Sequence, residues 1–167
     1  MHDYLIKTKH LGFRLLQQED IQYLAELNSD PDVRRFFPDG IQNREQTEAR
    51  INELISYYEK HKIPCFVMFD LQSGEFVGRS GFALTETDEI EVGYILQKKF
   101  WGKGLASEAL AALLQWARHN IAAEYIIAFA PIEHHASQRV MQKCGMEYYK
   151  KAIAKGVECC FYHIKIK

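Results

Sequence analysis

The hydrophobic and polar positions of this chain change their period near residue 64. Before that point, apolar side chains recur at helical spacing, as at Ile21, Leu24 and Leu27. After it, they form continuous or alternating runs of strand length, beginning with residues 65–69. The chain is therefore expected to begin mainly with helices and to continue mainly with a sheet.

Three helical segments are expected before the sheet, after a short strand at residues 12–16. Asp20 opens the first. Pro31 begins a short helical turn, because proline suits the first helical position. Asn43 begins the third, since Gln46 three residues later completes a capping-box pair.

The remaining strands are expected at residues 65–69, 76–84, 89–97, 125–130, 146–153 and 157–166. Two more helices are expected among them, at about residues 104–118 and around residues 136–141. Helices that cross between strands require some parallel pairing, whereas hairpins require antiparallel pairing. The sequence therefore predicts an α/β (α+β) fold with a mixed, mostly antiparallel central sheet and helices on both faces, in a single domain over residues 1–167.

Composition and charge exclude several classes of function. The chain has 167 residues, 47% hydrophobic and 26% charged, with a net charge of −1. Such a balance gives no overall field for binding nucleic acid or an anionic membrane. The first residues lack the apolar core of a secretory signal, and no apolar run approaches the roughly twenty residues that span a bilayer. We expect a cytoplasmic protein.

Cysteine and histidine spacing gives no sign of a metal site. The four cysteines are expected to be reduced, because they form no Cys-x-x-Cys pair. They are Cys65, Cys144, Cys159 and Cys160. Adjacent histidines at 134 and 135 would point apart on a helix. No bound metal is expected.

The strongest local feature is a strand, a basic glycine turn and an apolar helix in direct succession. Gly102 and Gly104 let the backbone turn sharply and bring N–H groups close to an anion. The following helix adds unpaired N–H groups, and Lys98, Lys99 and Lys103 add charge. Neither the dinucleotide-binding fingerprint nor the Gly-Lys-Ser/Thr pattern of nucleotide triphosphatases is present. The turn predicts a site for another phosphate-bearing ligand.

The sequence around this turn resembles the acetyl-CoA-binding motif of the GNAT acetyltransferase superfamily. The resemblance rests on Glu91-Val92-Gly93-Tyr94 and on Trp101-Gly102-Lys103-Gly104-Leu105-Ala106-Ser107-Glu108-Ala109. Lys99 stands where the family has arginine or glutamine. Residues 134–146 resemble the Asn-x-x-Ser-x-x-Val-x-x-Lys-x-Gly-Phe signature of the ribosomal-protein-alanine N-acetyltransferase branch, with His134 replacing asparagine and Met146 replacing phenylalanine. The resemblance implies the GNAT acyl-CoA N-acyltransferase fold, with strands that splay to admit the cofactor.

The resemblance also implies which residues contact acetyl-CoA. They are Tyr94, Ile95, Leu96, Lys99, Trp101, Gly102, Lys103, Gly104, Leu105, Ala106, Ser107, His134 and Ser137. Backbone N–H groups of the strand end would bind the acetyl carbonyl, and Trp101 would anchor the turn to the sheet. Ser137 would protonate the departing thiolate, or else is an exposed helix hydroxyl. His134 would contact the pantetheine arm, or else faces solvent at a helix start.

Glu91 is the candidate general base, because a partly buried carboxylate beside the cofactor would have a raised pKa. A solvated or ion-paired carboxylate is the alternative, and Glu89 and Glu158 are further candidates for the base. The implied function is direct transfer of acetyl from acetyl-CoA to a primary amine, on a peptide N-terminus or a small molecule. A CoA-binding regulatory module without turnover and a plain interaction domain are the alternatives. Homodimers are frequent among relatives.

Overall fold

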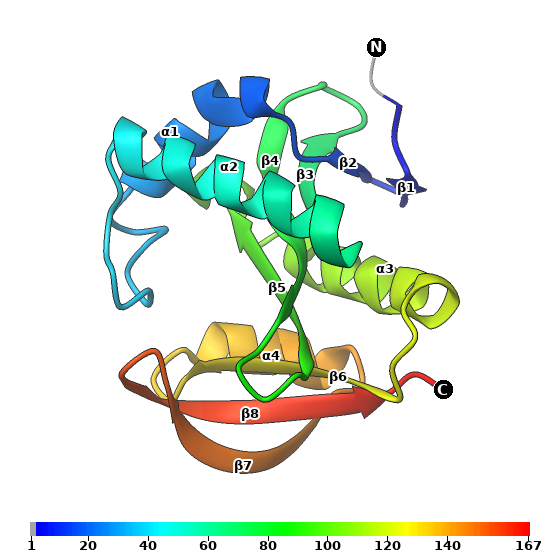
Figure 1. The fold of residues 1–167 in the computed structure, drawn as a ribbon. Helices are drawn as coiled ribbons and strands as arrows, with labels where there is room; N and C mark the ends of the chain where they lie inside the picture. Colours follow the sequence, from blue (N-terminus) through cyan, green and yellow to red (C-terminus); the bar gives the residue numbers. More distant parts are fainter. Residues whose placement is uncertain (1–2) are drawn as a thin grey trace.

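A computed structural model describes residues 3–167, and its elements follow one another as drawn in Figure 1. The strands are β1 (Ile6–Lys7), β2 (Leu11–Leu15), β3 (Cys65–Asp70), β4 (Phe76–Leu84), β5 (Ile90–Leu96), β6 (Tyr125–Pro131), β7 (Glu147–Ala154) and β8 (Val157–Lys165). The helices are α1 (Ile21–Ser29), α2 (Arg44–His61), α3 (Leu105–Asn120) and α4 (His135–Lys143). Short 3₁₀ turns cover Gln18–Asp20 and Lys98–Phe100.

The eight strands form one sheet in the order β1-β2-β3-β4-β5-β6-β8-β7. Every neighbouring pair is antiparallel except β5 and β6, which run parallel. β5 pairs with β4 along its whole length, from Leu84 opposite Ile90 to Gly78 opposite Leu96. Its pairing with β6 is confined to Glu91 opposite Ile127. Beyond that point the two parallel strands diverge, and Figure 1 shows β5 leaving the layer that holds β6, β8 and β7.

Both faces of the central strands are covered, which explains the unbroken apolar run of β3. Phe66 and Met68 pack in the cluster that contains Leu110 and Leu113 of α3. Their neighbours Val67 and Phe69 point to the other face and pack with α1 and α2, through side chains that include Leu24, Leu27 and Ile51. A strand buried on both faces shows no alternation, as expected.

The structure confirms the predicted mixed, mostly antiparallel sheet with helices on both faces, and most predicted bounds differ from the observed ones by one or two residues. The two-residue strand β1 was missed, because it is too short to show a pattern. The short helical turn predicted after Pro31 is present as a single turn: the Arg34 amide donates to the Asp30 carbonyl, four residues earlier, at 3.0 Å. The chain then continues as turns and not as a regular helix.

No helix among residues 3–167 has both the length and the apolar character needed to cross a membrane.

The predicted start of α2 is confirmed in atomic detail. The Gln46 amide donates to Asn43 Oδ1 at 2.8 Å, and the Asn43 amide donates to Gln46 Oε1 at 2.9 Å. These two bonds satisfy two backbone donors that a helix start would otherwise leave without partners. The cap fixes where the α1–α2 loop ends.

Replacing Asn43 with alanine should lower the free energy of unfolding by about 1 kcal/mol, because the N-cap acceptor is lost. For a chain of this size, the melting temperature should fall by about 2–4 °C. Thermal unfolding followed by circular dichroism measures the change. Glu48→Ala, an exposed change within the same helix, is the control and should leave the melting temperature almost unchanged. Equal melting temperatures for Asn43→Ala and the native chain would contradict the capping assignment.

Candidate functional site

The turn between β5 and α3 presents a row of backbone amides without protein partners. The first helical bond of α3 runs from the Glu108 amide to the Gly104 carbonyl, at 3.1 Å. Within residues 3–167, none of the backbone amides from 102 to 107 donates a hydrogen bond to another backbone oxygen or to a side chain. The turn therefore keeps six consecutive N–H groups available, at the positive end of a 16-residue helix.

Two glycines of this turn have left-handed backbone conformations and open space around them. Gly102 has φ of 74° and Gly104 has φ of 78°, a region that side chains with a Cβ rarely adopt. A Cβ at either position would meet nothing within 4 Å. The two glycines thus permit the left-handed conformation of the turn and leave open space beside its amides. Such a space suits a diphosphate.

Two of the three lysines expected to charge this turn are engaged elsewhere. Lys98 Nζ lies 2.7 Å from Asp32 Oδ2, and Lys99 Nζ lies 2.7 Å from Glu75 Oε1, all four side chains being more than half exposed. Lys103 carries no ion pair within residues 3–167 and lies over the Phe100 ring. The amides, rather than a cluster of free lysines, are the main anion-binding element in this structure.

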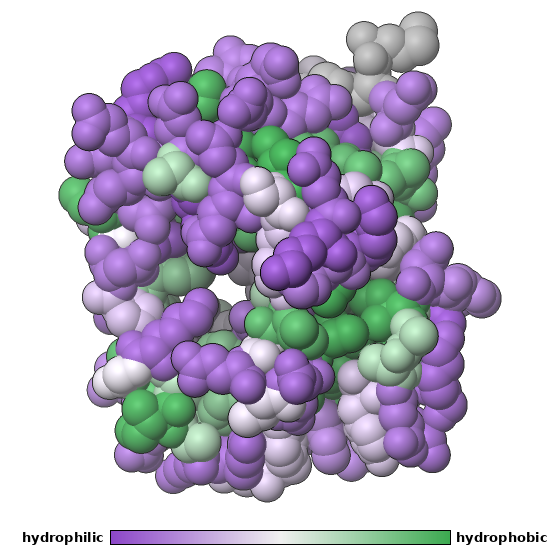
Figure 2. Space-filling model, viewed as in Figure 1, coloured by the Kyte–Doolittle hydropathy of each residue, from purple (hydrophilic) through white to green (hydrophobic). Residues whose placement is uncertain are grey.

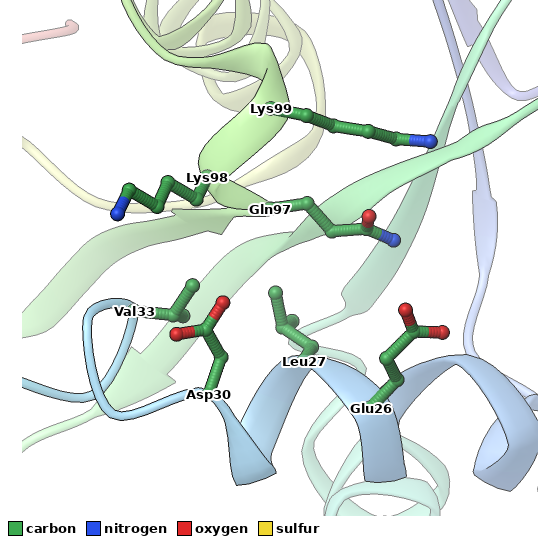
Figure 3. Close-up of a pocket in the computed structure, with 7 residues that line it drawn as sticks. All are labelled: Glu26, Leu27, Asp30, Val33, Gln97, Lys98 and Lys99. Carbon is green, nitrogen blue, oxygen red and sulfur yellow. The ribbon is translucent and has the colours of Figure 1, made fainter.

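A cavity of about 370 Å³ lies between α1 and the start of this turn (Figure 3). It is lined by Glu26, Leu27, Asp30, Val33, Gln97, Lys98 and Lys99. In Figure 3 the carboxylates rise from α1 and the following turn, while the two lysines extend in opposite directions from the other wall. Its walls carry charges of both signs, so it is a poorer candidate for a polyanionic ligand than the row of amides.

Two side chains fix the turn to the rest of the fold. Trp101 Nε1 donates to the Leu96 carbonyl at 3.0 Å and so ties the turn to the end of β5, as its predicted anchoring role requires. Glu108, in the first turn of α3, accepts from Thr8 Oγ1 at 2.6 Å and from the His10 amide at 2.9 Å. The carboxylate is thereby directed to the β1–β2 hairpin, which ties the helix start to that hairpin.

The diverging edge of β5 offers two more amides. The Gln97 amide donates to the Val77 carbonyl of β4, at 2.8 Å. Because amides alternate along a strand, those of Tyr94 and Leu96 face the opening toward β6, and the amide of Ile95 faces β4. Of the three predicted backbone contacts, Tyr94 and Leu96 are thus the ones whose N–H groups face the opening.

Tyr94 and Ser137 meet across the opening. The Tyr94 hydroxyl lies 3.1 Å from Ser137 Oγ, in the first turn of α4, and 3.4 Å from the Ser137 carbonyl oxygen. Burial raises the pKa of Tyr94 to about 12, so its hydroxyl stays protonated at neutral pH. Ser137 is partly buried and hydrogen-bonded, which excludes the alternative of a plainly exposed helix hydroxyl.

His134, at the N-terminus of α4, stacks on Phe36 of the α1–α2 loop. The ring centroids are 4.0 Å apart and the planes are inclined by 9°. Burial lowers the pKa of His134, and the charges of Arg35 and His135 act in the same direction. The imidazole is therefore neutral near pH 7 and is not a plainly solvent-facing group. The stack joins two segments that lie on opposite sides of the splayed strands.

Glu91 lies on the other face of β5 from Tyr94, toward α1 and α2. Burial raises the pKa of Glu91 above its ordinary 4.5, against the effect of three nearby cations, Lys155, Arg50 and Arg79. Gly93, two residues further on and on the same face, is exposed in the middle of the sheet, and a Cβ there would meet nothing within 4 Å. Figure 2 shows the molecule hollowed between the part that carries α1 and α2 and the part that carries the C-terminal strands.

The other candidate bases are placed less favourably. Glu89 is held by the Thr87 hydroxyl, at 2.8 Å, in the turn before β5. Glu158 is exposed on β8.

Within residues 3–167, no group of three or more histidine, cysteine or acidic side chains is arranged to hold a metal ion, and the four cysteines are free thiols.

Neither Phe36 nor Gly93 was among the predicted site residues. A glycine inside a strand is a known sign of a backbone that something approaches closely, so Gly93 carried a usable signal. The contact of Phe36 with His134 could not be predicted, because it joins positions about a hundred residues apart.

Comparisons with known proteins agree on one family. The model of the acetyltransferase (GNAT) domain matches residues 10–147. The uncharacterized N-acetyltransferase YnaD of Bacillus subtilis is 31% identical over 157 residues, covering 92% of this chain and 90% of YnaD.

Two solved structures share the fold at lower identity. The ribosomal-protein-S5-alanine acetyltransferase of Vibrio fischeri is 17% identical, with a TM-score of 0.82, over 98% of this chain and 97% of its own. The spermidine N-acetyltransferase of Vibrio cholerae, solved with CoA and spermine, is 16% identical, with a TM-score of 0.79, over 95% of this chain and 96% of its own.

Replacing Gly104 with alanine should weaken acetyl-CoA binding about tenfold, because the methyl group enters the space beside the amides and the turn loses its conformation. Gly156→Ala is a matched control, since Gly156 has the same φ of 78° and equally open surroundings. Both variants should lose about 1–2 kcal/mol of stability from the left-handed backbone. Calorimetric titration with acetyl-CoA separates the two effects. Equal affinities for the two variants would contradict the assignment of the turn.

Proposed function

Because the chain belongs to the GNAT acetyltransferase family, whose members depend on acetyl-CoA, we propose that it transfers the acetyl group directly to a primary amine. The observation that carries this proposal is the row of unbonded amides at residues 102–107, continuous with the open edge of β5. A cytoplasmic location belongs to the same proposal and is supported by the four free thiols.

The donor substrate would be held along this edge. The amides of residues 102–107 would bind the diphosphate, and Lys103, which has no ion pair in the described residues, would add charge. Lys99 would add charge only by leaving Glu75. The amides of Tyr94 and Leu96 would receive the thioester carbonyl, where they can stabilise the negative charge that develops on its oxygen. His134, neutral and stacked on Phe36, would offer one donor and one acceptor to the amide-bearing arm of the donor.

The two proton transfers of the reaction, from the amine and to the leaving thiolate, would take place on opposite faces of β5. The acceptor amine must be neutral to attack, and Glu91, on the α1–α2 side, would take its proton, directly or through water. The amine nitrogen then forms a bond to the carbonyl carbon as the carbon–sulfur bond breaks. The departing thiolate, on the α4 side, would take a proton from Ser137 Oγ. The products are the acetylated amine and the free thiol of CoA.

Tyr94 supports this role of Ser137. Its hydroxyl, 3.1 Å from Ser137 Oγ, stays protonated because its pKa is raised to about 12. It can therefore donate to the serine oxygen while that oxygen gives up its proton, which stabilises the charge on it. Most of the acceleration would still come from holding the amine and the thioester together.

Glu91→Gln should lower kcat/KM about 10²-fold, because a general base typically contributes that much. Since burial raises the pKa of Glu91 above 4.5, the native enzyme should lose activity as the pH falls through that raised value. The profile is measured as kcat/KM for the neutral form of the amine. The acid limb should be absent in Glu91→Gln and retained in Glu89→Gln. An unchanged acid limb in Glu91→Gln would assign the base elsewhere.

Ser137→Ala should lower kcat about tenfold or more while leaving acetyl-CoA affinity nearly unchanged, because the serine acts on the leaving group. The assay is thiol release with peptide and small amines as acceptors, beside calorimetric binding of acetyl-CoA. Tyr94→Phe should give a smaller loss in the same direction. Binding of acetyl-CoA by the native chain without thiol release from any amine would instead favour a CoA-binding regulatory module.

A further inference from the structure

The acceptor side of β5 contains an open trough in the middle of the sheet. Along this face Glu91 stands opposite Ala83, Gly93 opposite Gly81 and Ile95 opposite Arg79. Because Gly93 and Gly81 face each other, β4 and β5 carry no side chains on this face between the Glu91–Ala83 pair and the Ile95–Arg79 pair. Gly81 is covered, since a Cβ there would lie 2.4 Å from the Pro64 carbonyl oxygen, whereas Gly93 is open. A substrate can therefore lie over Gly93 with Glu91 beside it.

Arg79 stands on the same face as this trough. It is partly buried. Burial raises the pKa of the Glu91 carboxyl and of the buried Cys65 thiol, and the nearby charge of Arg79 opposes that rise in both. Within residues 3–167 no carboxylate lies at ion-pair distance from Arg79. A partly buried guanidinium without a carboxylate partner is available to an anion that enters from outside.

Lys155 brings a second cation from the far side. It occupies the tight turn between β7 and β8, with φ of 52°, and is exposed. Burial raises the pKa of Glu91, and the nearby charge of Lys155 opposes that rise; the same charge also acts on Asp39, in the α1–α2 loop. Figure 1 shows this hairpin tip approaching the α1–α2 loop. No ion pair to Lys155 exists within residues 3–167.

Two other arginines of this region have carboxylate partners. Arg34 pairs with Asp39 at 2.7 Å, and Arg50 pairs with Glu53 at 3.0 Å. Arg35, which lies over the Phe36 ring, has no ion pair within residues 3–167 and adds a further positive charge to the α1–α2 loop. Cations without carboxylate partners therefore outnumber the single carboxylate of Glu91 on this side of the sheet. An acceptor with a second ammonium group would place like charges together there, whereas an acceptor with an anionic group would find partners.

Building on the function proposed above, we propose that the acceptor is a primary amine that carries an anionic group, a carboxylate or a phosphate, at its other end. The amine lies at Glu91 over Gly93, and the anionic group lies between Arg79 and Lys155. The same arrangement disfavours polyamines.

A series of four-carbon amines tests this assignment. 4-Aminobutyrate, butylamine and 1,4-diaminobutane each have four carbon atoms, and at the end opposite the reacting amine they carry a carboxylate, a methyl group and an ammonium group. With saturating acetyl-CoA, kcat/KM from thiol release should be about tenfold or more higher for 4-aminobutyrate than for 1,4-diaminobutane. 2-Aminoethyl phosphate and ethanolamine are compared in the same way to test a phosphate. The anion that raises kcat/KM more over its uncharged counterpart, butylamine for the carboxylate or ethanolamine for the phosphate, is the preferred one.

Arg79→Gln and Lys155→Gln should each reduce the ratio of 4-aminobutyrate to 1,4-diaminobutane severalfold. Arg118→Gln, on α3 and likewise partly buried, is the control and should leave the ratio unchanged. Lys155 is exposed, so its variant keeps the test valid even where Arg79→Gln fails to fold.

The possible failures of the two proposals differ. Faster acetylation of 1,4-diaminobutane, or ratios that neither variant changes, would overturn the anionic acceptor while leaving the acetyltransferase mechanism intact. Thiol release from none of these amines or of the peptides, despite bound acetyl-CoA, would overturn the proposed transfer itself.

Discussion

Unpaired backbone amides are the constraint on which this structure depends. One edge of β5 pairs with β4 along its full length, whereas the other edge pairs with β6 at a single pair of residues. The chain then enters a turn with two left-handed glycines, where six consecutive amides have no protein partner in the described residues. Backbone N–H groups near a protein core need partners. In the proposed function, a ligand with carbonyl and phosphate oxygens supplies these partners to one strand edge and one helix start.

Because β5 and β6 pair at a single point, the two parts of the sheet on either side of the opening need other contacts to hold them together. Two such contacts lie between the hydroxyls of Tyr94 and Ser137 and between the rings of Phe36 and His134. One joins β5 to α4, and the other joins the α1–α2 loop to the start of α4. In the proposed function, residues that would act on a bound donor are thus also ones that span the opening.

Charge in this fold is arranged mainly by pairing. The lysines beside the glycine turn are largely neutralised by Asp32 and Glu75, and Glu108 is turned away to the β1–β2 hairpin. The acceptor face differs, because Arg79 and Lys155 remain without carboxylate partners in the described part of the chain. In the two proposals made above, recognition of the donor therefore relies on backbone amides, whereas recognition of the acceptor relies on full charges.

Local chemistry in the sequence determined the elements and the donor turn. A capping pair at Asn43, an apolar run at β3 and a glycine turn before an apolar helix each act over a few residues, so each can be recognised without knowing the fold. Contacts between distant segments were decided by tertiary structure alone. The stack of Phe36 on His134, the loss of free charge at Lys99 and the convergence of Arg79 and Lys155 on Glu91 depend on how the sheet twists and splays. No local pattern encodes them, because their energies arise only when remote parts of the chain are brought together.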